Sequence, residues 1–243
     1  MSPEPASSVA APGVVVIVAA RNEADRIGAT IGALREAFPG GEVWVADDAS
    51  EDGTADVALA HGARVVSRGR SHGKGGNMTA AGTAALSDGE PDLVLVCDGD
   101  LGASAGELAP LVDAVASGDC DLAVAMFRVR VGGGFGVALR YARWAIERGC
   151  GYRALAPISG QRAMRGEVLR ACLPFAPGYG MEEGMTIDAV RAGYRLREIE
   201  LDLAHRATGR NLRGFLHRAR QLRDFTRAYR ARRRARPDSL APQ

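Results

Sequence analysis

The chain has 243 residues, of which 47% are apolar, and a formal net charge of +2. This length and apolar fraction suit one α/β domain with a sizeable core and a small appendage. A membrane-spanning helix is excluded, because no apolar run reaches the roughly 18 to 20 residues that such a helix needs.

The chain ends and the cysteines bear on the cellular location of the protein. Residues 1–12 lack the basic start and apolar run of a signal peptide, so we expect a disordered tail there and another at residues 237–243. The four cysteines show no C-x-x-C spacing, which favours reduced thiols in a cytoplasmic protein. Any membrane contact is then expected to be peripheral and on the inner face.

Strand-like and helix-like patterns alternate over residues 13–126. Short apolar runs rich in β-branched residues predict strands, and the segments between them have apolar residues at helical spacing. This alternation predicts a mostly parallel, Rossmann-like sheet with helices on both faces. Asn22 is expected to cap the first helix. The predicted strands cover residues 14–18, 42–46, 63–66, 94–97 and 121–126, and later helices are predicted over 54–61, 78–86 and 104–117.

The chain is organised around the fourth of these strands, which runs directly into Asp98-Gly99-Asp100. Ligands of open α/β sheets collect outside the carboxyl ends of the strands, so both carboxylates are placed where a ligand would bind. Two carboxylates this close repel each other unless a cation lies between them, and Mg2+ and Mn2+ prefer oxygen ligands. Asp-Gly-Asp is also ordinary turn chemistry, so the strand end alone leaves both interpretations open.

Three more polar segments reach the same predicted sheet edge. Residues 19–23 follow the first strand, Asp47 and Asp48 follow the second, and the glycine-rich segment 68–77 contains Lys74, the only lysine of the chain. Exposed amides and a lysine at a helix start make an anion site. The segment is not a P-loop, because no Ser or Thr follows the lysine. Its glycines also do not follow the first strand, as a dinucleotide fingerprint requires.

The second half of the chain is less regular. A connecting loop is predicted over residues 127–134, and the next helix is predicted to carry Val137, Tyr141, Trp144 and Ile146 near one face. The predicted elements that follow are a helix over 135–150, a strand around 158–164, a short helix over 168–173, a helix opened by Glu182 and Glu183, and an antiparallel edge strand over 194–203.

Four segments stand in an order and spacing that resemble the family 2 glycosyltransferases with a GT-A fold, a group that includes polyprenyl-phosphate sugar transferases and soluble sugar synthases. The resemblance covers about residues 14–210. It implies a nucleotide-sugar-binding half over residues 13–126 and an acceptor-side, catalytic half with a smaller antiparallel portion over residues 127–211. The four segments are residues 19–23, 47–54, 73–75 and 98–100.

The resemblance implies a metal-dependent hexosyl transfer. The sugar would move from a nucleotide-sugar, with UDP the expected nucleotide, to a hydroxyl or phosphate of a small-molecule or lipid-phosphate acceptor. Ala20, Glu23 and Asp48 would hold the uridine, since an aspartate can accept the imide N–H of uracil. Lys74 would approach the base or the phosphates, and Asp98 would hold the ribose.

The resemblance also implies a divalent metal ion, Mg2+ or Mn2+, that bridges the diphosphate. Asp98 and Asp100 would bind it, and His205 looks like the additional metal ligand of some relatives. Arg206 and Arg210 would lie near the leaving diphosphate, which must be neutralised for the sugar to depart.

On the acceptor side, Glu182 resembles the base that takes the acceptor proton in an inverting transfer, with Glu183 the second candidate. The segment Gly160, Gln161 and Arg162 resembles the strand that lines the acceptor. The chain departs from the family in two respects: the acid pair is Glu-Glu where many relatives have Glu-Asp, and the membrane helices of the lipid-linked branch are absent.

Three alternatives to an inverting transfer stay open. The first is a retaining sugar synthase of the glucosyl-phosphoglycerate type, which resembles this chain in layout. The second is a nucleotidyltransferase, although residues 19–23 contain no glycine and such enzymes usually show a glycine-rich loop there. The third is a nucleotide-sugar-binding protein without turnover, against which the acids and His205 argue.

The C-terminal end is strongly basic, with twelve arginines and one acid, Asp224, over residues 205–236. Residues 212–236 have apolar residues at helical spacing and predict an amphipathic helix. Its apolar stripe either packs on the domain or forms a peripheral foot on anionic lipid, which would suit a lipid-phosphate acceptor. Few aromatic residues and no recognition motif argue against a nucleic-acid partner. The assembly state is left open, with a homodimer as one arrangement.

Overall fold

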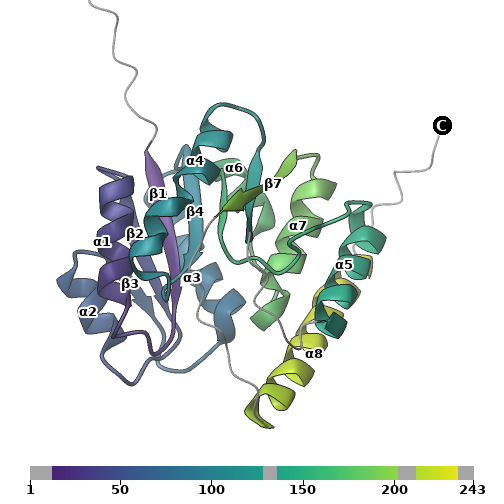
Figure 1. The fold of residues 1–243 in the computed structure, drawn as a ribbon, viewed down its shortest axis with the longest axis horizontal. Coiled ribbons are helices and arrows are strands. Elements are labelled where there is room, and N and C mark those ends of the chain that lie inside the picture. The colour runs from purple at the N-terminus through teal and green to yellow at the C-terminus, as the bar shows by residue number, and fades with distance from the viewer. Residues whose placement is uncertain (1–12, 128–135, 202–211, 235–243) are drawn as a thin grey trace, which may run out of the picture.

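The computed structural model describes residues 13–127, 136–201 and 212–234, with side chains of the last range described for 221–233 (Figure 1). In chain order the elements are β1 (Val14–Ala20), α1 (Ile27–Ala37), β2 (Glu42–Asp47), α2 (Thr54–Ala60), β3 (Arg64–Ser67), α3 (Gly73–Ser87), β4 (Leu93–Asp98), the 3-10 helix η1 (Gly102–Leu108), α4 (Ala109–Ala116), β5 (Leu122–Phe127), α5 (Gly136–Cys150), β6 (Arg162–Arg165), α6 (Gly166–Cys172), the 3-10 turn η2 (Gly178–Gly180), α7 (Met181–Arg191), β7 (Leu196–Leu201) and α8 (Leu212–Arg234).

Within the described ranges, seven strands form one sheet in the order β3-β2-β1-β4-β6-β5-β7. Strand β6 pairs antiparallel with β4 and β5, and the other described pairings are parallel. This confirms a mostly parallel α/β sheet with a smaller antiparallel portion. The edge position of β7 is also confirmed, but its predicted antiparallel direction was wrong, because β7 pairs parallel with β5. An alternation of polar and apolar residues indicates that one face of a strand is exposed to solvent, but it does not indicate whether the strand is parallel or antiparallel to its neighbour.

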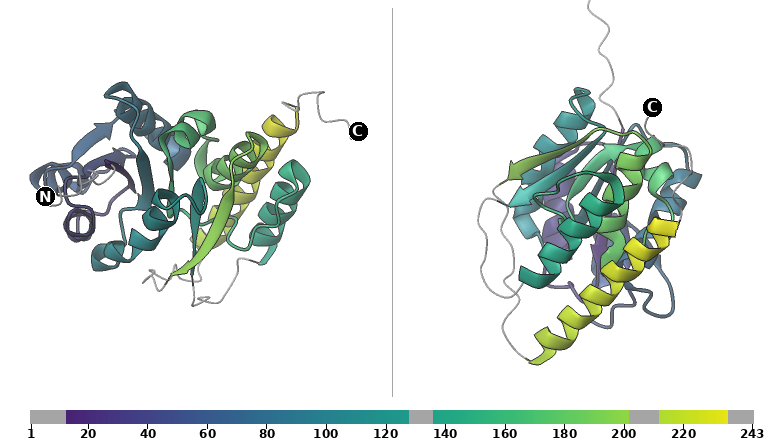
Figure 2. Two further views of the ribbon diagram at one scale, coloured as in Figure 1. Left: turned by 90° about the horizontal axis from the view of Figure 1, so that it is seen from above. Right: turned by 90° about the vertical axis from the view of Figure 1, so that its right-hand side faces the viewer.

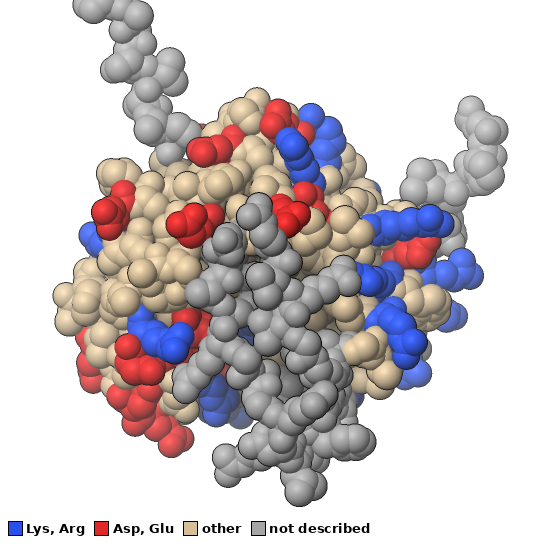
Figure 3. Space-filling model, viewed as in Figure 1, with Lys and Arg blue, Asp and Glu red and all other residues tan. Residues whose placement is uncertain are grey.

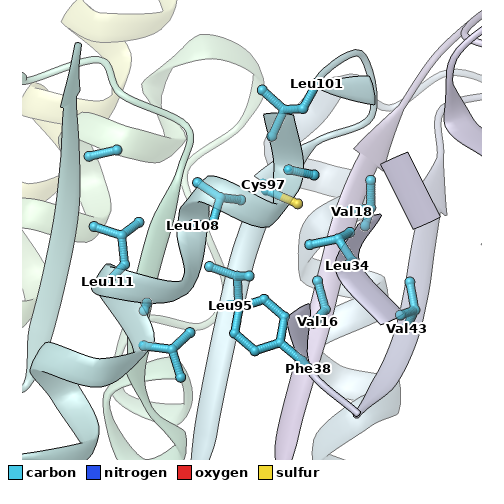
Figure 4. Packing of buried hydrophobic residues seen from close by; sticks show 14 of the residues in the cluster. Val16, Val18, Leu34, Phe38, Val43, Leu95, Cys97, Leu101, Leu108 and Leu111 are labelled. Carbon is cyan, nitrogen blue, oxygen red and sulfur yellow. The ribbon is translucent and has the colours of Figure 1, made fainter. Parts of the chain in front are cut away.

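The sheet is covered by helices on both faces because its central strands are apolar on both sides. Successive side chains of a strand point to opposite faces. Val16, Val18 and Leu95 pack with α1, η1 and α4, where Leu34 and Leu108 complete the cluster (Figure 4). The other face packs Ile17, Val94 and Val96 against α3, α6 and α7.

Two helix starts differ from the prediction. Asn22 does not cap α1, which begins at Ile27; the Asn22 Oδ1 atom accepts the backbone N–H of Glu51 at 2.9 Å and ties two loops together. Helix α3 begins at Gly73, five residues before the predicted start at Met78. Lys74 therefore lies in the first helical turn and not in a loop.

The predicted helix over residues 104–117 is two elements. Its first half is the 3-10 helix η1, and the α-helical part begins at Ala109 with Pro110 in its first turn. Proline has no N–H to donate, so it is accommodated at a helix start and not within a helix.

Helices α5 and α8 lie side by side on one flank of the molecule (Figure 2). The predicted inner face of α5 was wrong in part. Ile146 is buried, but the rest of the buried face consists of Ala138, Ala142 and Ala145, whereas Trp144 is half exposed. Small side chains let α5 approach its neighbours closely, and the larger ones are left on the outside.

The described part of α8 packs its apolar stripe on the domain, which confirms the first of the two interpretations for residues 221–233. Phe225, Ala228 and Tyr229 are buried. The approach to η2 is close, because a Cβ added at Gly180 would lie 2.7 Å from the Cβ of Ala228. No helix within the described ranges has the length and apolar character needed to cross a membrane.

Candidate active site

The polar loops predicted to meet at one sheet edge do meet there. In the register of the parallel strands, Ala20 lies opposite Asp47 and Ala19 lies opposite Asp98. The loops continue the ladder, since the Asp48 N–H donates to the Ala20 carbonyl and the Gly99 N–H to the Ala19 carbonyl, both at 2.9 Å. The three strand ends thus build one rigid platform.

Lys74 lies between two carboxylates at this edge. Its Nζ atom is 2.6 Å from Oδ1 of Asp98 and 2.8 Å from Oε1 of Glu182. Burial alone would lower the pKa of Lys74, but the two carboxylates outweigh it and raise the pKa, so the ammonium stays charged. The lysine joins the end of β4 to the start of α7, which are 84 residues apart in the chain (182 minus 98).

Two of the predicted acceptor-side residues contact Asp98 instead. The Gln161 side-chain amide donates to Oδ2 of Asp98 at 2.9 Å. Gly160 lies so close that a Cβ there would be 2.5 Å from Lys74 Nζ and 2.8 Å from Asp98 Oδ2. The absence of a side chain at Gly160 therefore leaves the room in which the lysine and the aspartate meet.

Arg162, the third predicted acceptor-side residue, is only 1% exposed and lies beneath the site. Its Nη1 atom donates to the Thr186 hydroxyl at 3.0 Å, and that hydroxyl donates to the Glu182 carbonyl at 3.0 Å. Burial lowers the pKa of Arg162, although Glu182 opposes that shift. Arg162 therefore supports the first turn of α7 from below and does not line an open surface.

The two glutamates at the start of α7 have different surroundings. Glu182 faces Lys74, whereas Glu183 is fully buried and both of its carboxylate oxygens have no hydrogen-bond partner among the described residues. Burial raises the pKa of Glu183 to about 8, while the nearby Arg232 acts in the opposite direction. Only Glu182 therefore shares the cluster of Asp98 and Lys74.

Asp48 is held by donors from the loop before α3. Its Oδ1 atom accepts the backbone N–H groups of His72 at 2.7 Å and Gly73 at 3.1 Å, together with the Asn77 side-chain amide. Its Oδ2 atom accepts the Ser71 hydroxyl at 2.8 Å and Arg21 at 3.3 Å.

These bonds decide the charge and availability of the Asp48 carboxylate. Burial would raise its pKa, but the hydrogen bonds from Ser71, His72 and Asn77 outweigh burial and lower it. The carboxylate also occupies the N-terminus of α3, the place predicted for an external anion. A uracil imide that bonds to Asp48 would have to replace one of the present donors.

The turn that carries Asp100 is fixed by α1. The Thr30 hydroxyl donates to the Gly99 carbonyl and accepts the Gly102 N–H, each at 2.8 Å. Arg26 donates to the Asp100 carbonyl at 3.2 Å. In the sequence, Thr30 is marked only as a polar residue on an otherwise apolar helix face.

The remaining predicted residues are placed as follows. Ala20 is buried at the end of β1, and Glu23 donates its backbone N–H to the Thr54 hydroxyl at 2.9 Å. His205, Arg206 and Arg210 lie outside the described residues. Within the described ranges, no group of three or more His, Cys, Asp or Glu side chains is arranged to hold a metal ion.

Comparison with known proteins identifies the family. Residues 15–171 match the model of "Glycosyl transferase family 2". The chain belongs to glycosyltransferase family 2. It is therefore an enzyme that transfers a sugar, and its fold is of the GT-A type.

Two curated relatives of this glycosyltransferase show the range of the family. The undecaprenyl-phosphate mannosyltransferase of Micrococcus luteus is 31% identical over 212 residues, which cover 81% of this chain and 85% of that protein. The glucosyl-3-phosphoglycerate synthase of Mycolicibacterium paratuberculosis is 33% identical over 198 residues, which cover 72% of this chain and 59% of that protein.

A solved structure supports the same placement of this glycosyltransferase. The crystal structure of glucosyl-3-phosphoglycerate synthase from Mycobacterium tuberculosis, in complex with Mn2+, uridine diphosphate and glucosyl-3-phosphoglycerate, matches with a TM-score of 0.73. The identity is 29%, and the match covers 95% of this chain and 82% of that chain.

Proposed function

We propose that this glycosyltransferase moves a hexose from a UDP-sugar to a phosphate-bearing acceptor, either a lipid phosphate or a small phosphorylated molecule. The observation that carries the proposal is the contact of Lys74 with both Asp98 and Glu182. It brings a residue of the predicted donor half together with the predicted base of the acceptor half. The complex of the Mycobacterium tuberculosis relative with UDP and a glucosylated phosphate compound supports both ligand classes.

The residues present fit a divalent metal ion. Asp98 and Asp100 offer carboxylate oxygens at a strand end, and the Asp98 side chain is 28% exposed, so a cation can reach it. With His205 as a third ligand, these residues would hold Mg2+ or Mn2+, which would neutralise the leaving diphosphate. Lys74 now places its own positive charge against Asp98.

The donor and leaving-group roles follow from the same edge of the sheet. We propose that Ala20, Glu23 and Asp48 border the uridine, since their loops join at the ends of β1 and β2. Arg206 and Arg210 are proposed to contact the diphosphate.

Glu182 is the proposed base for a hydroxyl acceptor. Its Oε1 atom lies 2.8 Å from the Lys74 Nζ atom, so the lysine would have to move toward the donor phosphates before an acceptor hydroxyl could take its place beside Glu182. A phosphate acceptor is already deprotonated near neutral pH and needs no base. Glu183 is the weaker candidate, because its carboxylate is fully enclosed.

We further propose a cytoplasmic location, peripheral contact with a membrane, and a homodimer.

The first test measures thermal unfolding with UDP, Mn2+ and EDTA. A ligand that binds only the folded state raises its stability, so UDP with Mn2+ should raise the melting temperature and EDTA should reverse the effect. Asp100→Asn should lose the metal-dependent part of the shift. Asp113→Asn, an exposed aspartate on α4, is the matched control and should keep it.

Transfer itself is then measured as UDP release from UDP-hexoses with undecaprenyl phosphate or 3-phosphoglycerate as acceptor. Acceptor-dependent release identifies the acceptor class. A chain that shows no shift with any uridine nucleotide, with or without metal, would contradict the UDP assignment and leave the family membership intact.

A further inference from the structure

The outer surface of α5 and α8 carries apolar side chains along the line where the two helices meet. Val137, Tyr141 and Trp144 stand at positions i, i+4 and i+7 of α5 and so lie on one helix face, and Leu222 lies on the neighbouring α8. Val137 is 62% exposed, Trp144 50% and Leu222 36%. We name Val137, Tyr141, Trp144 and Leu222 the α5–α8 seam.

The α5 part of the seam lies against α8, and the two helices run in the same direction. Ala142 packs with Phe225 in one buried cluster, and two residues further along α5 the ring of Trp144 lies 5.1 Å from the ring of Tyr229. The Trp144 ring is also 5.5 Å from that of Tyr141. The exposed apolar groups of α5 therefore form a strip beside α8, and Figure 2 shows the two helices side by side.

Arginines border this strip on both helices. The only exposed acid on the described parts of α5 and α8 is Glu147, which is paired with Arg153 at 2.8 Å, and Asp224 is buried. Figure 3 shows basic side chains gathered on this flank of the molecule. The exposed arginines are Arg140, Arg148, Arg223, Arg227, Arg230 and Arg233.

Most of these arginines are available for an outside partner. Among the described residues, Arg140, Arg148, Arg227, Arg230 and Arg233 take part in no ion pair. The surface thus combines an exposed tryptophan and exposed aliphatic side chains with unpaired cations. Proteins that bind a membrane surface have this composition, because the apolar groups enter the headgroup layer and the cations bind lipid phosphates.

We propose that the α5–α8 seam and its bordering arginines dock on an anionic lipid bilayer. The surface differs from the apolar stripe of the C-terminal helix, which is packed on the domain. A lipid partner is favoured over nucleic acid because Val137 and Leu222 are aliphatic and offer a base no stacking surface.

The docking surface is joined to the site. Asp224 of α8 accepts the backbone N–H of Tyr179 in η2 at 3.4 Å, and η2 leads directly into α7 with Glu182. A bilayer bound at the seam would therefore lie next to the acceptor side. The inference extends the lipid-phosphate form of the proposed function, but its test uses neither donor nor acceptor, so either proposal can fail alone.

Binding to vesicles is measured with the full chain, using phosphatidylglycerol vesicles and, for comparison, phosphatidylcholine vesicles. The chain has two tryptophans, and Trp44 is only 6% exposed, so a change in emission reports Trp144. We expect sedimentation with the anionic vesicles, a blue shift of the emission, and quenching by brominated lipid. Trp144→Phe should abolish the shift and the quenching.

The charge contribution is tested with Arg230→Glu/Arg233→Glu. Each basic residue near an anionic surface contributes about a five-fold gain in binding, so the double variant should bind the vesicles weaker by a factor of about 25 or more. The matched control is Arg170→Glu/Arg197→Glu, which changes net charge equally on exposed arginines of α6 and β7.

Three results would overturn the proposal. They are equal binding to neutral vesicles, an equal loss in both double variants, and sedimentation without any change in Trp144 emission. Preferential binding of a single-stranded RNA that leaves vesicles unbound would also overturn it and assign the arginines to nucleic acid.

Discussion

Among the described residues, Lys74 contacts both Asp98 and Glu182, and its removal would take a buried cation away from these two carboxylates. We expect Lys74→Met to lower the free energy of unfolding by about 2–4 kcal/mol and to reduce sugar transfer strongly. Urea unfolding and UDP release measure the two effects. Lys74→Arg keeps the charge and should retain more stability than Lys74→Met.

The matched control for this substitution is an exposed ion pair. Arg170 lies 2.6 Å from Glu90, and both side chains are about half exposed. Arg170→Gln should change stability by less than about 0.5 kcal/mol. A Lys74→Met chain as stable as Arg170→Gln would contradict the importance of the central contact.

Glu183 predicts a pH dependence of stability, because its pKa is about 8 in the folded chain and near 4.5 in a free side chain. Below pH 4.5 the Glu183 carboxyl is protonated in both the folded and the unfolded chain, so it does not make stability depend on pH. As pH rises from there to about 8, the unfolded chain loses the proton and the folded chain retains it, so stability falls by up to about 4 kcal/mol.

Glu183→Gln should remove this loss, since glutamine has no proton to release. The variant should match the native chain near pH 4.5 and be more stable at pH 8, measured by urea unfolding across that range. Glu107→Gln, on the exposed surface of η1, should follow the native profile. Parallel profiles for the native chain and Glu183→Gln would show that the buried carboxyl is solvated or paired.

At the scale of elements, the packing of α8 on η2 depends on the lack of a side chain at Gly180. A Cβ there would lie 2.7 Å from Ala228 and 2.9 Å from the Asp224 carbonyl oxygen. We expect Gly180→Ala to destabilise the chain by about 1–3 kcal/mol, because overpacking forces the helix outward.

Gly32 of α1 is the control for this substitution, since an added Cβ would meet no atom within 4 Å. Gly32→Ala should stabilise the chain by about 0.5–1 kcal/mol, because alanine is the better helix former. Thermal unfolding of both variants gives the comparison. If Gly180→Ala also stabilises, α8 does not pack as closely as described.

The elements that could be predicted from the sequence are those whose signal is local. Strands β1, β2 and β4 are apolar runs, so their existence and the polar loops after them followed from the pattern. The parallel direction of β7 and the loop contact of Asn22 depend on residues far away in the chain. The outer position of Trp144 was missed because alanines, with weak hydrophobicity, form the packed face of α5.

The candidate site likewise has some features that could be predicted from the sequence and others that could not. Asp98, Lys74 and Glu182 could be predicted as residues of one site, because strand ends and helix starts collect at one edge of a sheet. Their direct contact could not, since it depends on the distances of α3 and α7 from the end of β4. The bond of Gln161 to Asp98 could not either, since it depends on the pairing of β6 with β4. Thr30 was missed because a polar residue on an apolar helix face does not reveal its partner, which is a backbone carbonyl 69 residues further along the chain.

At the scale of the whole molecule, one sheet runs through both predicted halves of the chain, since β4 of the first half pairs with β6 of the second. We therefore expect one cooperative unfolding transition. Trp44 emission is followed in a Trp144→Phe chain, and Trp144 emission is followed in a Trp44→Phe chain. In each variant, the urea midpoint from emission should equal the midpoint from circular dichroism. Two separate transitions within one chain would show that the halves fold independently.

The central lysine has a practical consequence as well. A protease that cleaves only after lysine has one target bond in the whole chain, between Lys74 and Gly75. In the native protein that bond lies in the first turn of α3, and the side chain that the enzyme must grasp is bound by Asp98 and Glu182. A single cut into fragments 1–74 and 75–243 would therefore report, in one band shift on a gel, that the active site has opened.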